Sequence, residues 1–296
     1  MSRRGTWRQS TIMRLGRTDS FLVKALITYS IPTWFFSKFY SNAPPSSQFS
    51  GIATVSFDCD HRADIAALPT LLDILDSYDF TASFACIGTL IERYPAEHRL
   101  IVDHGHEVVN HTHTHPYSEE LGSKERFDMI SKSDQRKEIL ECHRVCKELL
   151  SYEPIGFRIP HFGIQHTDAI YPILSELGYK YSTSILAVRT KTCGLPYSVD
   201  GIWEFPISTC PRHPFQAFDT YHAFRSKMTS HRSEDQYFET FKTMVSTIAA
   251  AGGYLATYFD PQDMCRFNDF GRFLDLLSER MRPMRFIDIA QTIQRG

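Results

Sequence analysis

From residue 51 onward, short β-rich runs alternate with longer stretches whose apolar residues recur at helical spacing. Runs typical of buried strands occupy residues 52–58, 81–88, 106–111 and 254–259, and amphipathic helical patterns occupy residues 63–78, 131–150 and 233–253. Ser133 is the expected N-cap of the second helix. Strands that alternate with helices predict a parallel sheet. About seven such repeats in about 245 residues favour a closed or nearly closed (β/α) barrel over an open sheet.

The carboxyl ends of the predicted strands carry polar or unusual residues. They have the sequences "FDCD", "NHTHTHP", "FRIPHFG", "WEFP" and "YFDPQD". In barrels of this kind the chemistry lies at the carboxyl ends of the strands. The sequence therefore predicts a functional site at this end.

Composition narrows the class of protein. A net charge of −2, with 42% hydrophobic and 22% charged residues, is typical of a globular protein and argues against general nucleic-acid binding. The seven cysteines are scattered, odd in number and form no CxxC pair. This usage favours reduced thiols in a cytoplasmic protein over a disulfide framework.

Residues 1–50 differ from the rest and are predicted to form a basic, aromatic N-terminal extension and linker, with residues 51–296 as the main domain. Residues 1–24 carry a net charge of +5, and no signal-peptide cleavage site stands out after them. The apolar stretch that follows has only 13 uncharged residues, interrupted by Pro32, too few for a transmembrane helix. For residues 1–40 two interpretations stay open, peripheral contact with an anionic membrane or a helix packed on the domain.

Asp58 and Asp60 lie two residues apart at the end of the first predicted strand, so both side chains would face the same side of the sheet. Burying two carboxylates about 6–7 Å apart costs free energy unless a cation or hydrogen bonds compensate their charges. The pair is a candidate for metal binding or catalysis. Aspartates that cap a helix at a β–α turn are the alternative.

Three histidines occupy five positions in the segment 111–115. On an extended strand His111 and His115 would lie about 13 Å apart and could not share an ion. If the chain curls just after Asn110, side chains at i and i+4 come together. Two imidazoles and one carboxylate would leave positions for water, as in a catalytic zinc-type site. His113 would then point away from the ion.

The segments "SFDCD", "HGHEVVNHTHTHP" and "GFRIPHFG" resemble the successive motifs of polysaccharide deacetylases, the NodB-homology domain of carbohydrate esterase family 4. The first resembles a Thr/Ser-Phe-Asp-Asp run, with one residue between the carboxylates. The second resembles a His-Ser/Thr-x-x-His motif from His111, and the third an Arg-x-Pro motif from Arg158. The resemblance covers about residues 51–290 and implies an α/β fold, a deformed (β/α) barrel of about seven parallel strands.

The resemblance also implies roles for individual residues. Asp58 corresponds to the general base, and Arg158 to the arginine that orients it. Asp60, His111 and His115 correspond to the ligands of a divalent transition metal, zinc in the first place, with cobalt or manganese as alternatives.

Further residues are expected around the substrate. Pro160 and His161 belong to the third motif, and the backbone N–H near His161 corresponds to the family's oxyanion donor. Trp203, in "GIWEFP", is a candidate for substrate binding, with packing in the barrel wall as the alternative.

The residue at the position of the family's general acid differs from the family pattern. A late-strand histidine is usual, but Asp260 occupies the matching stretch "LATYFDPQD". An aspartic acid could serve if burial or a neighbouring carboxylate raised its pKa. Asp263 and His161 are alternatives. The segment 210–232, with three histidines, is expected to be a surface insertion beside the site.

The resemblance favours a cytoplasmic, metal-dependent hydrolase that removes an N-acetyl group from an amino sugar during glycan assembly. Its partner would be a carbohydrate, lipid-linked or nucleotide-linked, and not nucleic acid. Two alternatives stay open: a hydrolase of small amides or ureides on the same barrel, and a non-catalytic, metal-holding glycan-binding domain that has lost its acid.

Overall fold

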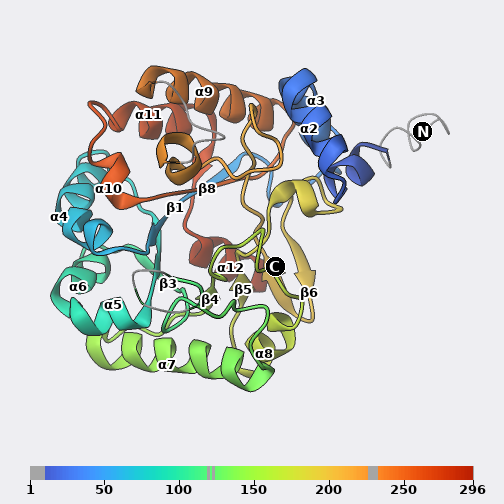
Figure 1. Cartoon of the computed structure of the whole chain (residues 1–296). Helices are drawn as coiled ribbons and strands as arrows, with labels where there is room; N and C mark the ends of the chain where they lie inside the picture. The colour runs from blue at the N-terminus through green and yellow to red at the C-terminus, as the bar shows by residue number, and fades with distance from the viewer. Residues whose placement is uncertain (1–10, 119–120, 122–123, 226–232, 296) are drawn as a thin grey trace.

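The computed structural model describes residues 11–118, 121, 124–225 and 233–295 (Figure 1). Its strands are β1 (Ile52–Cys59), β2 (Ser83–Cys86), β3 (Glu107–Asn110), β4 (Gly156–Phe157), β5 (Tyr181–Ser182), β6 (Tyr197–Val199), β7 (Ile202–Glu204), β8 (Leu255–Phe259) and β9 (Arg282–Pro283). Its α-helices are α2 (Phe21–Ser30), α3 (Pro32–Tyr40), α4 (Arg62–Ser77), α5 (Gly88–Arg93), α6 (Pro95–Asp103), α7 (Lys132–Leu150), α8 (Ile170–Glu176), α9 (Glu234–Ala250), α10 (Pro261–Met264), α11 (Gly271–Arg280) and α12 (Phe286–Arg295). Short turns η1 (Ala187–Arg189) and η2 (Tyr221–Arg225) complete these elements.

The strands form one sheet in the order β6-β7-β5-β4-β3-β2-β1-β8, with β9 paired to β1. Every pair is parallel except β6 with β7. Helices surround the sheet, with α4 to α8 along one side and α9 and α11 along the other (Figure 1). The predicted α/β barrel with mainly parallel strands is confirmed.

Closure of the barrel takes an irregular form. The sheet has no continuous ladder between β7 and β8 among the described residues. Instead, the chain beyond β7 approaches β8, where the Ser208 N–H donates to the Ala256 carbonyl (2.8 Å) and the Ala256 N–H donates to Ser208 Oγ (3.1 Å). The barrel is therefore deformed, as the family resemblance implied.

One local expectation is wrong, and two strands differ from what the sequence suggested. Ser131, not Ser133, caps α7, because its Oγ accepts the N–H of Asp134. The strand that precedes the third motif, β4, is short and contains Gly156 and Phe157. Strand β6, with half-buried and exposed residues, was not predicted from the sequence.

One end of the barrel is covered by α12. Phe286 packs against the rings of Tyr181 and Phe205, each at 5.7 Å between centroids. The N–H groups of Phe286 and Ile287 donate to Ser83 Oγ and to Glu107, which begin β2 and β3. This covers the amino ends of the strands and leaves the carboxyl ends for the polar residues. None of the helices among the described residues is long and apolar enough to cross a bilayer.

Glu107 is a buried carboxyl in this covered end. It accepts hydrogen bonds from Ser83 Oγ (2.6 Å), the Tyr181 hydroxyl and the Ile287 N–H (3.1 Å). Burial nevertheless raises the pKa of Glu107 from 4.5 to about 7. The folded protein therefore favours the protonated form of this side chain.

A Glu107→Gln variant should change how stability depends on pH. Because the folded-state pKa lies above the unfolded one, the stability that Glu107 contributes is complete below about pH 4.5 and is lost as pH rises toward 7, by about 3 kcal/mol. Urea unfolding between these pH values should show this loss in the wild type relative to the variant. Glu239→Gln, at an exposed carboxylate, is the control. An unchanged profile in Glu107→Gln would contradict the assignment.

Candidate active site

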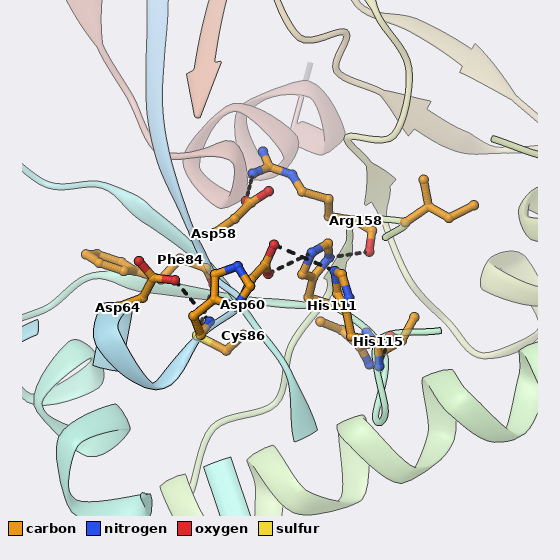
Figure 2. Close-up of polar contacts among 12 residues, drawn as sticks. Asp58, Asp60, Asp64, Phe84, Cys86, His111, His115 and Arg158 are labelled. Atoms are coloured by element: carbon orange, nitrogen blue, oxygen red, sulfur yellow. Dashed lines mark hydrogen bonds and ion pairs between the residues drawn. The ribbon is translucent and has the colours of Figure 1, made fainter. Parts of the chain in front are cut away.

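The carboxyl ends of β1, β3 and β4 bring together the residues of the three motifs (Figure 2). Asp58 is the next-to-last residue of β1, and Asp60 follows this strand. His111 directly follows β3, and Arg158 directly follows β4. β3 pairs with β2 and β4, and β2 pairs with β1, so these ends lie along one edge of the sheet.

The chain curls after Asn110, as the metal hypothesis required. Thr112 adopts a left-handed backbone conformation (φ 66°), and so does His115 (φ 48°). The Asn110 side chain supports the turn, because its Oδ1 accepts the Thr112 N–H (3.0 Å) while its Nδ2 donates to the Ile139 carbonyl (2.9 Å). The rings of His111 and His115 consequently lie 4.9 Å apart.

Glu138, on α7, holds the outer part of this loop. Its carboxylate accepts the N–H groups of His113 (3.0 Å) and Thr114 (2.7 Å) and the Thr114 hydroxyl (2.8 Å). The His113 ring points toward Glu92, with 3.9 Å between Nε2 and Oε2, and is outside the His111–His115 pair. The sequence analysis did not identify Glu138, because no local pattern links it to the loop.

Asp60, His111 and His115 form a group with the chemistry of a metal site. One ligand atom from each lies within 4.8 Å of the others. The Asp60 carboxylate lies 3.3 Å from His111 Nε2 and 3.7 Å from His115 Nε2. Asp60 Oδ1 and both ring nitrogens of His115 are buried without a hydrogen-bond partner among the described residues. Buried polar atoms normally have partners, so a cation at this point would satisfy them.

The protonation of the group also suits a metal. His111 Nδ1 lies 2.9 Å from the Arg158 carbonyl, and donation to this oxygen leaves Nε2 as the lone-pair nitrogen toward Asp60. Burial lowers the pKa of His115 to about 3, although Asp60 opposes the shift. Burial disfavours the charge of Asp60, but the imidazoles of His115 and His111 outweigh it and hold the pKa of Asp60 far below its usual value. Burial lowers the pKa of His111, but Asp60 outweighs burial and the net shift is upward, so a metal would displace a proton from this ring. One carboxylate and two imidazoles are a donor set that fits a divalent cation.

Arg158 and Asp58 form a buried ion pair beside this group. The guanidinium also donates to Ser56 Oγ (2.8 Å) and Thr183 Oγ1 (3.4 Å), two supports that the sequence analysis missed. Burial raises the pKa of Asp58, while Arg158 and His111 oppose the shift. Arg158 therefore fixes the orientation of a carboxyl group that burial makes more basic.

The third motif continues along the edge of the site. The Ile159 N–H donates to Ser184 Oγ (2.9 Å), and Pro160 is buried next to it. His161 has a left-handed backbone (φ 49°), and its ring lies 4.8 Å from that of His115 and 5.8 Å from that of Tyr117. His161 thus lies directly beside the metal-capable group.

Asp260 lies at the end of β8 with partners that the sequence analysis missed. Its carboxylate accepts the Thr220 hydroxyl (3.1 Å) and forms an ion pair with Arg225, which also lies 3.1 Å from Asp263. Burial and the Asp64 carboxylate raise the pKa of Asp260 well above its usual value, although Arg225 opposes the shift. Thr220 and Arg225 belong to the predicted surface insertion and contact Asp260. The prediction that this segment lies on the surface is wrong for its described part, because Phe218, Asp219 and Thr220 are buried in the core. His231 of the same segment lies outside the described residues.

Trp203 is in a different place from the motif residues. It is half buried in β7, and its ring packs edge-on against Phe49 with 5.6 Å between centroids. Phe49 precedes β1, at the amino end of that strand. This contact places Trp203 in the barrel wall, the alternative to substrate binding.

The chain thus forms a deformed (β/α) barrel in which two imidazoles and a carboxylate that could hold a metal ion meet at the strand ends. Residues 52–182 match the profile of a family described as polysaccharide deacetylase. This segment of the chain is therefore similar to the polysaccharide deacetylase family.

Curated relatives are similar to part of this chain, and solved structures share its fold. A peptidoglycan-N-acetylglucosamine deacetylase of Bacillus cereus is 29% identical over 128 residues, which are 43% of this chain and 54% of the relative. This chain spans about half or less of the length of the first curated relatives it matches.

A Mycobacterium smegmatis protein solved as a candidate polysaccharide deacetylase superposes with a TM-score of 0.69 at 17% identity, over 86% of this chain and 93% of the other. An allantoinase superposes with a TM-score of 0.62 at 15% identity, over 84% and 93%. Both superpositions concern the fold.

Proposed function

We propose that the protein is a metal-dependent hydrolase that removes the N-acetyl group from an amino sugar during glycan assembly. The observation that carries this proposal is the group of Asp60, His111 and His115 beside the buried Asp58–Arg158 pair. The names of relatives support the substrate class, since these relatives are named as deacetylases of peptidoglycan or of chitooligosaccharide.

Asp60, His111 and His115 would hold the metal. Two imidazoles and one carboxylate suit zinc, with cobalt or manganese as alternatives. When bound, the metal would polarise the acyl carbonyl and lower the pKa of a coordinated water.

Asp58 would act as the general base. Burial raises its pKa, which strengthens its affinity for a proton, and the ion pair with Arg158 holds the accepting oxygen in place. The carboxylate is thus oriented before substrate binds, which favours catalysis because reorganisation is avoided.

Asp260 would act as the general acid. A carboxyl group with a raised pKa can hold the proton that the leaving amine requires. The backbone N–H near His161 would donate to the oxyanion, as the family resemblance implies.

An open pocket of about 650 Å³ lies next to the proposed site at the carboxyl ends of β1 and β8, lined by His61, Arg62, Ala63, Ala66, Arg225 and Gln262. None of the proposed metal or catalytic residues lines this pocket, but His61 follows Asp60 and Arg225 pairs with Asp260, so the pocket could hold a part of the substrate that extends beyond the reacting group. Polar groups of this kind can donate to sugar hydroxyls and to the phosphate of a lipid or nucleotide carrier. The exposed ring of Tyr117, which contacts His161, offers an apolar surface for a sugar face.

Metal content is the first test. Purified wild-type protein should contain about one equivalent of transition metal by elemental analysis, and His115→Ala should lose it, because a two-ligand site binds much more weakly. His113→Ala is the matched control, since His113 is in the same loop but outside the ligand group. Absence of metal from the wild type after zinc or cobalt is supplied would overturn the proposal.

Release of acetate from N-acetylated sugars tests the reaction itself. Chitooligosaccharides and peptidoglycan fragments should be assayed for released acetate, and allantoin for hydrolytic opening of its ring, so that hydrolysis of the ureide alone would identify the alternative hydrolase. If the protein binds sugar without turnover, Asp260→His tests the non-catalytic alternative. The ion pair of Asp260 with Arg225 is the observation that favours that alternative.

A further inference from the structure

The N-terminal helix α2 exposes apolar side chains where a surface helix normally has polar ones. The Ser20 side chain caps the helix by accepting the Val23 N–H, and Pro32 begins the next helix. Leu22, Leu26 and Tyr29 follow i, i+4 and i+7 spacing, so they share one face. Their side chains are 78%, 65% and 79% exposed.

Neighbouring residues enlarge this apolar face. We call the outer face the α2 patch, and it consists of Phe21, Leu22, Leu26, Tyr29, Ile31 and Trp34. These six are half of the twelve large hydrophobic side chains that are exposed in the described part of the chain. Apolar groups concentrated in this way mark an interaction surface.

The patch is held firmly by the barrel. Four aromatic residues of α3 are buried, and Phe35 packs against Phe215 with 5.6 Å between ring centroids. The Tyr40 hydroxyl accepts the Thr209 N–H (3.3 Å). Arg189 donates to the Thr18 carbonyl and pairs with Asp19 (2.9 Å) just before α2.

Figure 1 shows α2 and α3, in blue, at the edge of the molecule beside α9. Ile27 is buried and Val23 packs against the core, so α2 is anchored on one side while Phe21, Leu22, Leu26 and Tyr29 remain exposed.

Charge decides which partner fits. Residues 1–50 contain seven Lys and Arg residues and one acid, Asp19, in a chain whose net charge is −2. Lys24 lies on α2 itself, and Lys38 lies on α3. The positive charge is therefore concentrated in the segment that carries the α2 patch.

We infer that the α2 patch docks on an anionic lipid membrane, with α2 lying in the interface. Leu and Phe side chains would enter the acyl boundary, and Tyr29 and Trp34 suit the headgroup level. Lysines and arginines around them attract acidic lipids. A second copy of the chain fits less well, because a two-fold interface would bring the same positive charges together.

Vesicle flotation of the full chain tests this inference. The wild type should float with vesicles of phosphatidylcholine mixed with phosphatidylglycerol, less with phosphatidylcholine alone, and less again at high salt. A triple Phe21→Ser, Leu22→Ser, Leu26→Ser variant should bind at least about tenfold more weakly. Trp34 fluorescence should shift to shorter wavelength on binding, and Trp34→Phe should remove that shift.

Matched variants make the outcome decisive. Met129→Ser with Leu140→Ser removes apolar groups that are exposed elsewhere (77% and 41%) and should leave flotation unchanged. His115→Ala should also float, because docking does not depend on the metal group. Flotation of the triple variant at the wild-type level, or none of the wild type, would overturn the inference. A wild-type dimer in sedimentation that the triple variant dissociates, without vesicle binding, would assign the patch to a second copy instead.

Discussion

Replacing Asp58 by Asn should lower kcat for acetate release by about 10²- to 10⁴-fold, the usual contribution of a general base. The amide has the size of the carboxylate, and its oxygen can still accept a hydrogen bond from Arg158. The variant therefore keeps the packing of a position that is 3% exposed. It loses the group that accepts the proton of the attacking water.

Metal analysis separates this effect from loss of the metal group. Asp58→Asn should retain about one equivalent of metal, whereas His115→Ala should not. Asp73→Asn, at an exposed position of α4, should leave both metal content and activity unchanged. Wild-type turnover in Asp58→Asn would exclude Asp58 as the base.

Arg158→Met should lower the free energy of unfolding by about 3–5 kcal/mol, because it leaves the Asp58 carboxylate buried without its cation. Arg158 is fully buried, and its guanidinium also satisfies the hydroxyls of Ser56 and Thr183. Urea denaturation followed by circular dichroism measures the loss.

A double-mutant cycle shows whether the pair is the cause. In Asp58→Asn with Arg158→Met the buried charge is gone, so the loss should be clearly smaller than in Arg158→Met alone. If the two single losses simply add, the buried ion pair is not what Arg158 stabilises. The comparison remains informative even if Arg158→Met is only marginally folded.

The sequence predicted those parts of the fold and site that depend on local periodicity. Alternating strands and helices indicated the barrel, and the ends of β1 and β3 could be recognised from the residues that follow them. The i, i+4 spacing of His111 and His115 required a curled chain, and Thr112 supplies this curl with its left-handed backbone. The structure places Asp60 beside both rings, as expected.

The parts that escaped prediction depend on contacts between distant residues. Glu138 is 24 residues from Thr114, and Arg225 is 35 residues from Asp260, so no local pattern connects them. The contact of Trp203 with Phe49 also joins two distant segments. The irregular closure beside β8 depends on single hydrogen bonds of Ser208 that have no signature in the sequence.

The two contacts of Arg158 have a consequence for any attempt to change the metal preference of the proposed site. Its side chain holds Asp58, and its carbonyl oxygen holds His111 Nδ1, so exchanging His111 would also disturb the carboxylate. Both ring nitrogens of His115, by contrast, have no partner among the described residues. Position 115 is thus the proposed ligand position that can be exchanged for cysteine or aspartate with least disturbance, and selection for a new metal is best started there.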